Sequence, residues 1–258
     1  MNSLRRIYAL ASNTFREAIR NKLLYTLLGF AFLMIASGVV LASLSYVEVD
    51  EILQDMGMGA IRLFGAGIAI FLGIGLVHNE VDRRTIFTIL SKPVSRAEFL
   101  VGKWAGLTAT VWIQVILMGI AFVSISGLAG APLGPDHLLA IALVGLELMV
   151  LVAIATLFSA FTTPMLASFF TVGFWMIGHL SREMRALGQQ SDSESVTSLA
   201  NIVFVVMPDF EVFNKTLEAV HGLPIPGREV LLAVVYAVGY ASCTLILASL
   251  IFDRRDFK

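Results

Sequence analysis

The sequence has few charged residues and almost no cysteine. Charged side chains make up 14% of its 258 residues, well below the ~25% of a typical soluble domain. Hydrophobic residues make up 57%, and the mean hydropathy is +0.84. So few charges cannot cover so much apolar surface in water, which excludes an ordinary soluble protein and a disordered chain. The single Cys243 lies in an apolar run, which excludes an internal disulfide and a cysteine metal cluster.

The common motifs of catalysis are also missing. No stretch matches the phosphate-binding loop Gly-x-x-x-x-Gly-Lys-Ser/Thr, because Gly102-Lys103 is followed by Trp104. His78-Asn79-Glu80 does not continue into a His-Glu-x-x-His zinc helix, and the four histidines have no ligand spacing. There is no Gly-x-Ser-x-Gly nucleophile turn. We therefore expect no ATPase site, no metal and no bound cofactor in this chain, and no nucleic-acid partner.

Long apolar runs are what the sequence does contain. A membrane-spanning helix needs ~20 mostly apolar residues. Six stretches fit this pattern: residues 23–46, 60–77, 104–129, 138–161, 165–180 and 230–252. The first could mimic a secretory signal, but its apolar run is longer than the ~7–15 residues of such signals. The sequence predicts an all-α, multi-pass membrane protein with one domain, residues 1–258, and six spans in the lipid bilayer.

Basic residues are distributed unevenly between the two sides of these spans. Thirteen Lys and Arg residues lie in segments 1–22, 78–103 and 253–258, and five lie on the opposite side. Loops rich in Lys and Arg remain in the cytoplasm. We therefore expect both termini and residues 78–103 to be cytoplasmic, in a bacterial inner membrane.

Two segments outside the spans have an amphipathic pattern. Residues 4–22 place apolar side chains at three- and four-residue steps beside basic ones, which favours a helix lying in the cytoplasmic interface. They could also simply be a basic flank that orients the first span. Residues 181–229 form an outer loop with a polar start and two short amphipathic helices, either over the outer mouth or in the outer interface. Residues 199–207 could be re-entrant but are too short to cross.

The cytoplasmic loop 78–103 predicts a helix–turn–helix elbow. Ile86, Phe87 and Leu90 give its first helix an apolar face, and Pro93 ends that helix. Ser95 and Glu98 then form a Ser-x-x-Glu capping box that starts the next helix. The elbow either packs its apolar face against the membrane or docks a cytosolic partner by filling a groove. Its length exceeds the ~2–8 residues that most helix–helix connections need.

Glu147 is the one ionisable residue well inside a predicted span. It lies nine residues after Leu138, which is ~13 Å along a helix and near the middle of the bilayer. An acidic group there costs ~2–3 kcal/mol on insertion scales, so it must be paired, protonated or in contact with water. Glu147 is either a contact for a substrate or proton on a transport path, or a buried partner for a serine, a threonine, Gln114 or Trp112 of another helix.

Short motifs along the chain resemble one family. They are residues 15–22 before the first span, then Glu80, Arg84-Thr85, Leu90, Pro93, Arg96 and Gly102-Lys103 in the elbow, Pro208-Asp209 in the outer loop, and residues 254–257 in the tail. With six spans in matching order, the chain resembles the type-2, exporter-like permeases of ABC transporters. It is similar to compact permeases that work with a separate ATPase, including the copper-enzyme maturation permease of denitrifying bacteria, whose substrate is not carried over.

The resemblance implies a mechanism and a set of contacts. Two permease chains, identical or paralogous, would form a dimer, and a nucleotide-binding subunit carrying ATP and Mg²⁺ would bind each elbow. The implied ATPase-coupling residues are Glu80, Asp82, Arg83, Arg84, Thr85, Ile86, Phe87, Leu90, Pro93 and Arg96. Glu147 is the candidate residue on the substrate path.

Two other functions remain possible at the level of sequence. One is a membrane anchor that recruits a signalling partner through the elbow. The other is a secondary transporter, which would show inverted repeats around a mid-membrane site. The scarcity of charge in the second and fifth spans, which line the pathway by family analogy, favours a lipidic, amphipathic or peptide-like cargo over a small ion.

Overall fold

The computed structural model describes residues 3–44, 49–82, 95–191 and 193–253, with the backbone alone for residue 49 and residues 76–82. This described part is helical and contains no strand, which confirms the all-α prediction. In chain order the elements are α1 (Ser3–Ile19), α2 (Lys22–Leu44), α3 (Val49–Asp82), α5 (Arg96–Leu128), α6 (Pro135–Phe161), α7 (Pro164–Gln189), α8 (Glu194–Val206), the 3-10 helix η1 (Phe210–Val212), α9 (Thr216–Val220) and α10 (Gly227–Asp253).

Five helical stretches of the described chain are long and apolar enough to cross a membrane: α2, residues 50–75 of α3, α5, α6 and α10. A sixth would be the pair Glu194–Val206 and Phe210–Val220, which is bent by 60°. The predicted span 165–180 forms the first part of α7 instead. That helix is not among the five, and it continues to Gln189 through a polar stretch that includes Arg182, Glu183 and Arg185.

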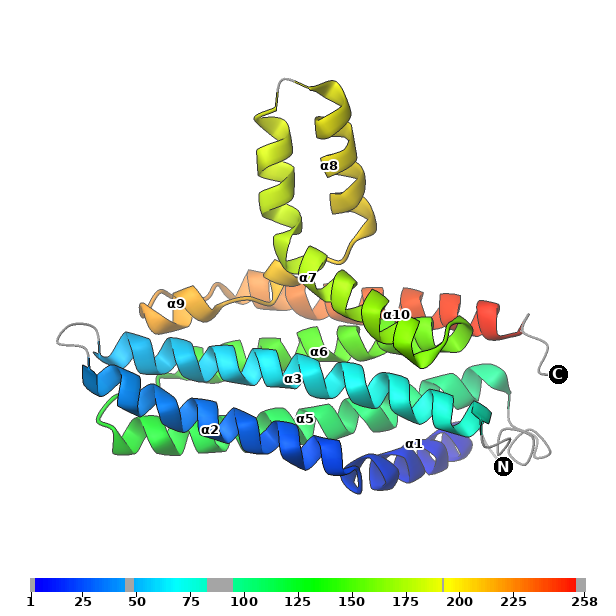
Figure 1. The fold of residues 1–258 in the computed structure, drawn as a ribbon, viewed down its shortest axis with the longest axis horizontal. Helices are drawn as coiled ribbons and strands as arrows, with labels where there is room; N and C mark the ends of the chain where they lie inside the picture. The colour runs from blue at the N-terminus through cyan, green and yellow to red at the C-terminus, as the bar shows by residue number, and fades with distance from the viewer. Residues whose placement is uncertain (1–2, 45–48, 83–94, 192, 254–258) are drawn as a thin grey trace.

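The helix ends fall into two groups along the bundle. The start of α1, the end of α3, the start of α5 and the end of α10 lie together at one end, which we call the elbow end (Figure 1). The end of α2, the start of α3 and α9 lie at the opposite end (Figure 1). The start of α1 and the end of α10 therefore lie at the same end of the bundle. That this elbow end is cytoplasmic remains a prediction.

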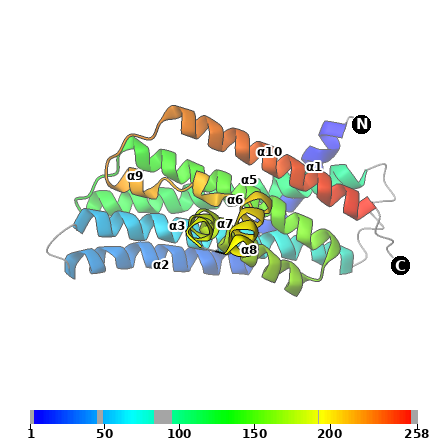
Figure 2. The ribbon, with the colours of Figure 1, turned by 90° about the horizontal axis from the view of Figure 1, so that it is seen from above.

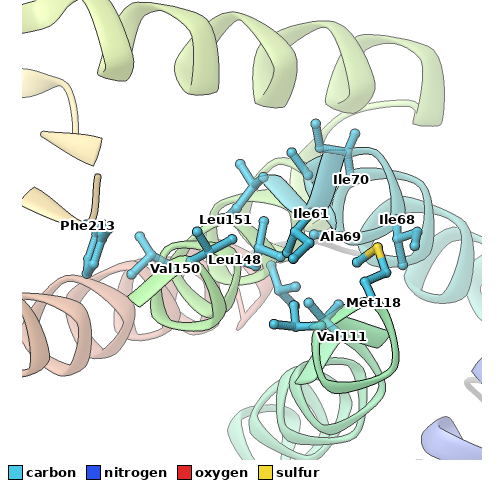
Figure 3. Packing of buried hydrophobic residues seen from close by; sticks show 14 of the residues in the cluster. Ile61, Ile68, Ala69, Ile70, Val111, Met118, Leu148, Val150, Leu151 and Phe213 are labelled. Carbon is cyan, nitrogen blue, oxygen red and sulfur yellow. The ribbon is translucent and has the colours of Figure 1, made fainter. Parts of the chain in front are cut away.

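Helix α6 is the centre of the bundle, with α3, α5, α7 and α10 packed around it. Close packing with α3 depends on two glycines. A Cβ on Gly65 would lie 2.6 Å from Leu148 Cδ1, and a Cβ on Gly73 would lie 2.7 Å from Ala155 Cβ. Around this contact, Ile61, Ile68 and Ile70 of α3 are buried with Val111, Met118, Leu148 and Leu151 (Figure 3). Small residues at such contacts let helix backbones approach closely.

The last part of α7 and all of α8 form a hairpin that stands away from the bundle (Figure 1). Seen from above, the two arms are viewed end on, so they run across the direction of the bundle helices (Figure 2). After α8 the chain returns to the bundle through residues 208–220, which we call the cap. The cap is anchored by Phe210 and Phe213, both 0% exposed within the main hydrophobic core (Figure 3 shows Phe213).

Local sequence signals account for several helix ends. The Ser95 side chain accepts a hydrogen bond from the Glu98 backbone, and the Glu98 side chain accepts one from the Ser95 N–H, which confirms the predicted capping box. Helix α6 ends at Phe161 and α7 begins at Pro164, where proline is favourable because its missing N–H has no partner within the helix.

Candidate functional site

Glu147 lies in the middle of α6, and it is 0% exposed. Both side chains that donate hydrogen bonds to it come from α7. Trp175 Nε1 donates to Glu147 Oε1 over 3.0 Å, and His179 Nε2 lies 3.0 Å from the same oxygen. Trp175 and His179 are four residues apart, so they share one face of α7. The structure therefore shows Glu147 paired with polar groups of another helix.

Arg62 brings a third helix to this carboxylate. Its Nε lies 3.4 Å from Glu147 Oε2, an ion pair without a hydrogen bond, because neither atom has a hydrogen-bond partner. Arg62 Nη2 donates to Thr216 Oγ1 of α9 over 3.5 Å. One guanidinium thus connects α3, α6 and the cap.

The contacts continue from His179 into the cap. His179 Nδ1 lies 3.2 Å from Glu211 Oε1, and Asn214 Nδ2 donates to both carboxylate oxygens of Glu211 at 3.3 and 3.1 Å. Glu211 is in η1, whose first turn is capped by the Asp209 side chain. We call Arg62, Glu147, His179 and Glu211 the buried charge network. It runs from the centre of the bundle to the cap.

A second set of contacts holds the cap beside this network. Arg182 forms an ion pair with Asp209 at 2.8 Å, and the Asp209 backbone N–H donates to the Tyr236 hydroxyl over 2.8 Å. Gly178 is needed for the close approach, since a Cβ there would lie 2.5 Å from Phe210 Cδ2 and 2.7 Å from Pro208 O. The Phe210 ring then packs 5.6 Å from the His179 ring, between centroids.

A cavity opens at the edge of the network. It has a volume of about 350 Å³, and it is lined by Arg62, Trp175, Met176, His179 and Leu180. Arg62, which is cationic, and His179, which becomes cationic on protonation, line the cavity. Glu147 is not part of the lining and is 0% exposed. Within the described residues, no group of three or more His, Cys, Asp or Glu side chains is arranged to hold a metal ion. The side chains of the buried charge network can instead hold ionic charges and bind a proton.

The elbow end has a separate group of charged contacts. Arg96 Nη1 donates to the backbone oxygens of Phe252 and Asp253 at 2.6 and 3.2 Å, and so caps the end of α10. Arg6 of α1 forms an ion pair with Glu98 at 2.7 Å. Lys103 Nζ lies 3.8 Å from Glu17 Oε2 of α1. The start of α5 is therefore joined to both α1 and α10.

Most of the predicted ATPase contacts lie outside the part of the chain that the structure describes. These are Arg83, Arg84, Thr85, Ile86, Phe87, Leu90 and Pro93. Glu80 and Asp82 are on the last turns of α3, where only the backbone is described. Arg96 is described, and it is bonded to the end of α10. Its contact with an ATPase, like those of the other residues, remains a prediction.

The sequence pointed to Glu147 but did not identify its partners. Arg62 lies near the start of the predicted span 60–77 and His179 near the end of the predicted span 165–180. Nothing in the local sequence marks either residue, taken alone, as a partner of Glu147. One signal was available, since Trp175 and His179 are spaced by one helical turn in an otherwise apolar stretch. The other contacts join residues that are far apart in the chain, such as Arg62 with Glu147 and Thr216.

Residues 8–257, almost the whole chain, match the family described as ABC-2 family transporter protein. The chain belongs to this family. No curated protein matches it significantly. As an ABC-2 family member, the protein is a membrane component of an ABC transporter, and the family implies an ATPase partner. The resemblance found in the short motifs of the elbow and tail is thereby confirmed at the level of the family.

Proposed function

We propose that this ABC-2 protein is the permease subunit of an ATP-driven exporter, that it works as a dimer with a second permease chain, and that a separate ATPase binds each elbow, residues 78–103. ATP and Mg²⁺ are held by the ATPase subunit. The family match supports the role of a transporter component, and the positive-inside rule supports a cytoplasmic elbow.

The joint at the start of α5 is the observation that carries this proposal. The elbow is followed directly by a capped helix whose first residues are bonded to α1 through Glu98 and to α10 through Arg96. Phe99 and Phe252 also stack, with ring centroids 6.2 Å apart. A force applied to the elbow would therefore move the ends of three helices together, which is what ATPase-driven switching of a permease requires.

The cargo class is proposed from the same structure. Exposed apolar side chains are common on the helices of the bundle, and the cavity beside Arg62 combines two polar groups with Trp175, Met176 and Leu180. This lining suits a lipidic, amphipathic or peptide-like cargo with an apolar part and a polar group. Because Glu147 is fully buried, its influence on cargo would be exerted through Arg62 and His179.

Charge reversal in the elbow tests the docking assignment. The double variant Arg83→Glu, Arg84→Glu should abolish co-purification with the ATPase subunit of the transporter, because two attractive contacts become repulsive. Membrane insertion and yield should remain unchanged. Arg228→Glu is the matched control, since Arg228 is exposed near the start of α10 at the opposite end of the bundle.

Undiminished co-purification of the double variant would contradict docking at the elbow. Stimulation of the ATPase by a candidate amphipathic cargo in lipid discs separates a transporter from an anchor. An anchor that recruits the ATPase would bind it without any stimulation by cargo.

A further inference from the structure

His179 has a carboxylate at each of its two ring nitrogens. Nε2 lies 3.0 Å from Glu147 Oε1, and Nδ1 lies 3.2 Å from Glu211 Oε1. A neutral imidazole carries one N–H and can donate only one hydrogen bond, whereas an imidazolium donates two. Two carboxylates facing one ring therefore require an additional proton, either on the ring or on one of the two carboxyl groups.

The other contacts of the carboxylates place that proton on the ring. Glu147 accepts a hydrogen bond from Trp175 Nε1 and lies beside the Arg62 guanidinium, and both groups favour a negative charge. Glu211 accepts from Asn214 Nδ2 at both of its oxygens. Glu147 is thus bonded at Oε1 and faces a guanidinium at Oε2, while Glu211 accepts at both oxygens, and these contacts stabilise the ionised form of each carboxylate.

We propose that His179 is a proton-binding site whose bound proton fastens the cap, residues 208–220, to the centre of the bundle. With the proton in place, Arg62 and His179 carry two positive charges against the negative charges of Glu147 and Glu211. Without it, the network holds an uncompensated negative charge beside a carboxylate that is 0% exposed. Leaving such a charge unpaired in the interior is strongly unfavourable.

The cavity lined by Arg62, Trp175, Met176, His179 and Leu180 gives this site access to protons. The His179 side chain is 17% exposed, whereas that of Glu147 is 0% exposed. Water in the cavity can therefore exchange a proton with the ring without separating α3, α6 and α7. Glu211, with a side chain 27% exposed, is the acceptor on the cap side.

The other charged groups around the ring are engaged elsewhere. On α7 itself, Arg182 is paired with Asp209 of the cap. In and after the cap, Lys215 is paired with Glu218 and Glu229. Helix α8 contributes Glu194 at its first residue, beside the loop that joins the two arms of the hairpin. From α3, α6 and η1, the charged groups that face His179 are Arg62, Glu147 and Glu211.

Proton binding at His179 fixes the sign of the pH dependence of cap closure. The closed cap holds the proton between two carboxylates, and an open cap removes Glu211 from the ring, so closure is accompanied by proton binding. By linkage, lower pH favours the closed cap and higher pH favours the open one, as long as Glu211 remains ionised. Because all the groups involved belong to this chain, the pH dependence does not require an ATPase to bind at the elbow.

The charge state of the ring is tested directly by nuclear magnetic resonance of the full chain in lipid discs, with ¹⁵N-labelled histidine. At neutral pH the signal that disappears in His179→Gln should show both ring nitrogens protonated. His221 is the internal control, because its side chain is 44% exposed and its contact with Glu51 is longer, at 3.7 Å. A neutral single tautomer at His179 would overturn the proposal.

The coupling to the cap is tested by amide hydrogen exchange of residues 208–220, corrected for the intrinsic effect of pH. In the wild type, exchange should accelerate several-fold as pH rises from below to well above the ordinary histidine pKa of ~6.5. In Glu211→Gln, which keeps its place in η1, exchange should be fast and lose this pH dependence. His221→Gln should behave as the wild type. Cap exchange in the wild type that is independent of pH, or unchanged by Glu211→Gln, would also overturn the proposal.

Discussion

The elbow end and the buried charge network use charge in different ways. At the elbow end, Arg96 binds backbone oxygens at the end of α10, and Lys103 pairs with Glu17, whose side chain is 41% exposed. In the network, side chains pair with one another around Glu147, which no solvent reaches. Because Arg96 binds backbone oxygens at a partly buried helix end, we expect its loss to cost less than the loss of Glu147, the buried carboxylate that Arg62 and His179 share. Removing one charged side chain should therefore lower stability more in the network than at the elbow end.

The largest effect is expected for Glu147→Ala. This variant leaves the Arg62 and His179 charges without their shared carboxylate in the interior, which typically costs ~3–5 kcal/mol. Thermal unfolding in lipid discs should show a strongly lowered midpoint. Glu147→Gln is the matched control and should be intermediate, because its amide oxygen still accepts from Trp175. A Glu147→Ala variant as stable as the wild type would contradict the larger contribution of the network to stability.

A smaller effect is expected where α1 packs on α5. A Cβ on Gly106 would lie 2.5 Å from Ala11 O and 2.8 Å from Thr14 Cβ, so Gly106→Ala forces the two helices apart. Overpacking of this kind costs ~1–3 kcal/mol. Gly127→Ala on the same helix meets nothing within 4 Å and should leave the unfolding midpoint unchanged or raised. Equal midpoints for the two variants would contradict the close contact of α1 and α5.

The smallest effect is expected for Arg96→Ala at the elbow end. It removes the hydrogen bonds to Phe252 O and Asp253 O, which should cost ~1–2 kcal/mol because the helix end is only partly buried. Hydrogen exchange should accelerate in the last turn of α10. Arg16→Ala, at an exposed position of α1, is the control and should have no such effect. An unaltered last turn would show that Arg96 does not hold α10.

Local features were predictable from the sequence, because their causes lie within a few residues. The capping box of Ser95 and Glu98, the amphipathic first helix and the gap between the predicted spans 138–161 and 165–180 depend on backbone preferences and on helical spacing. The match to residues 8–257 confirms the family that short motifs had suggested. Gly65 and Gly73 of α3 allow the close packing against α6 that the structure shows.

The network and the hairpin were not predictable, because their causes lie in tertiary contacts. Arg62 is in α3, His179 in α7 and Glu211 in η1, and only the packed bundle brings them to Glu147. Helix α7 continues past the apolar stretch because its polar last part packs against α8, where Thr197 Oγ1 donates to Gly188 O. The sequence predicts an outer loop from residue 181 onward instead.

Helix α5 also has a mechanical consequence. Its 33 residues contain no proline between Arg96 and Leu128, so it forms a continuous rod about 50 Å long at ~1.5 Å per residue. If the rod pivots at its capped start, a tilt of about 5° moves its far end by about 4 Å. Gln114 and Phe122, buried along this helix, would be displaced in proportion to their distance from the pivot. The geometry of a lever thus converts a small rotation at the elbow end into a larger shift across the membrane.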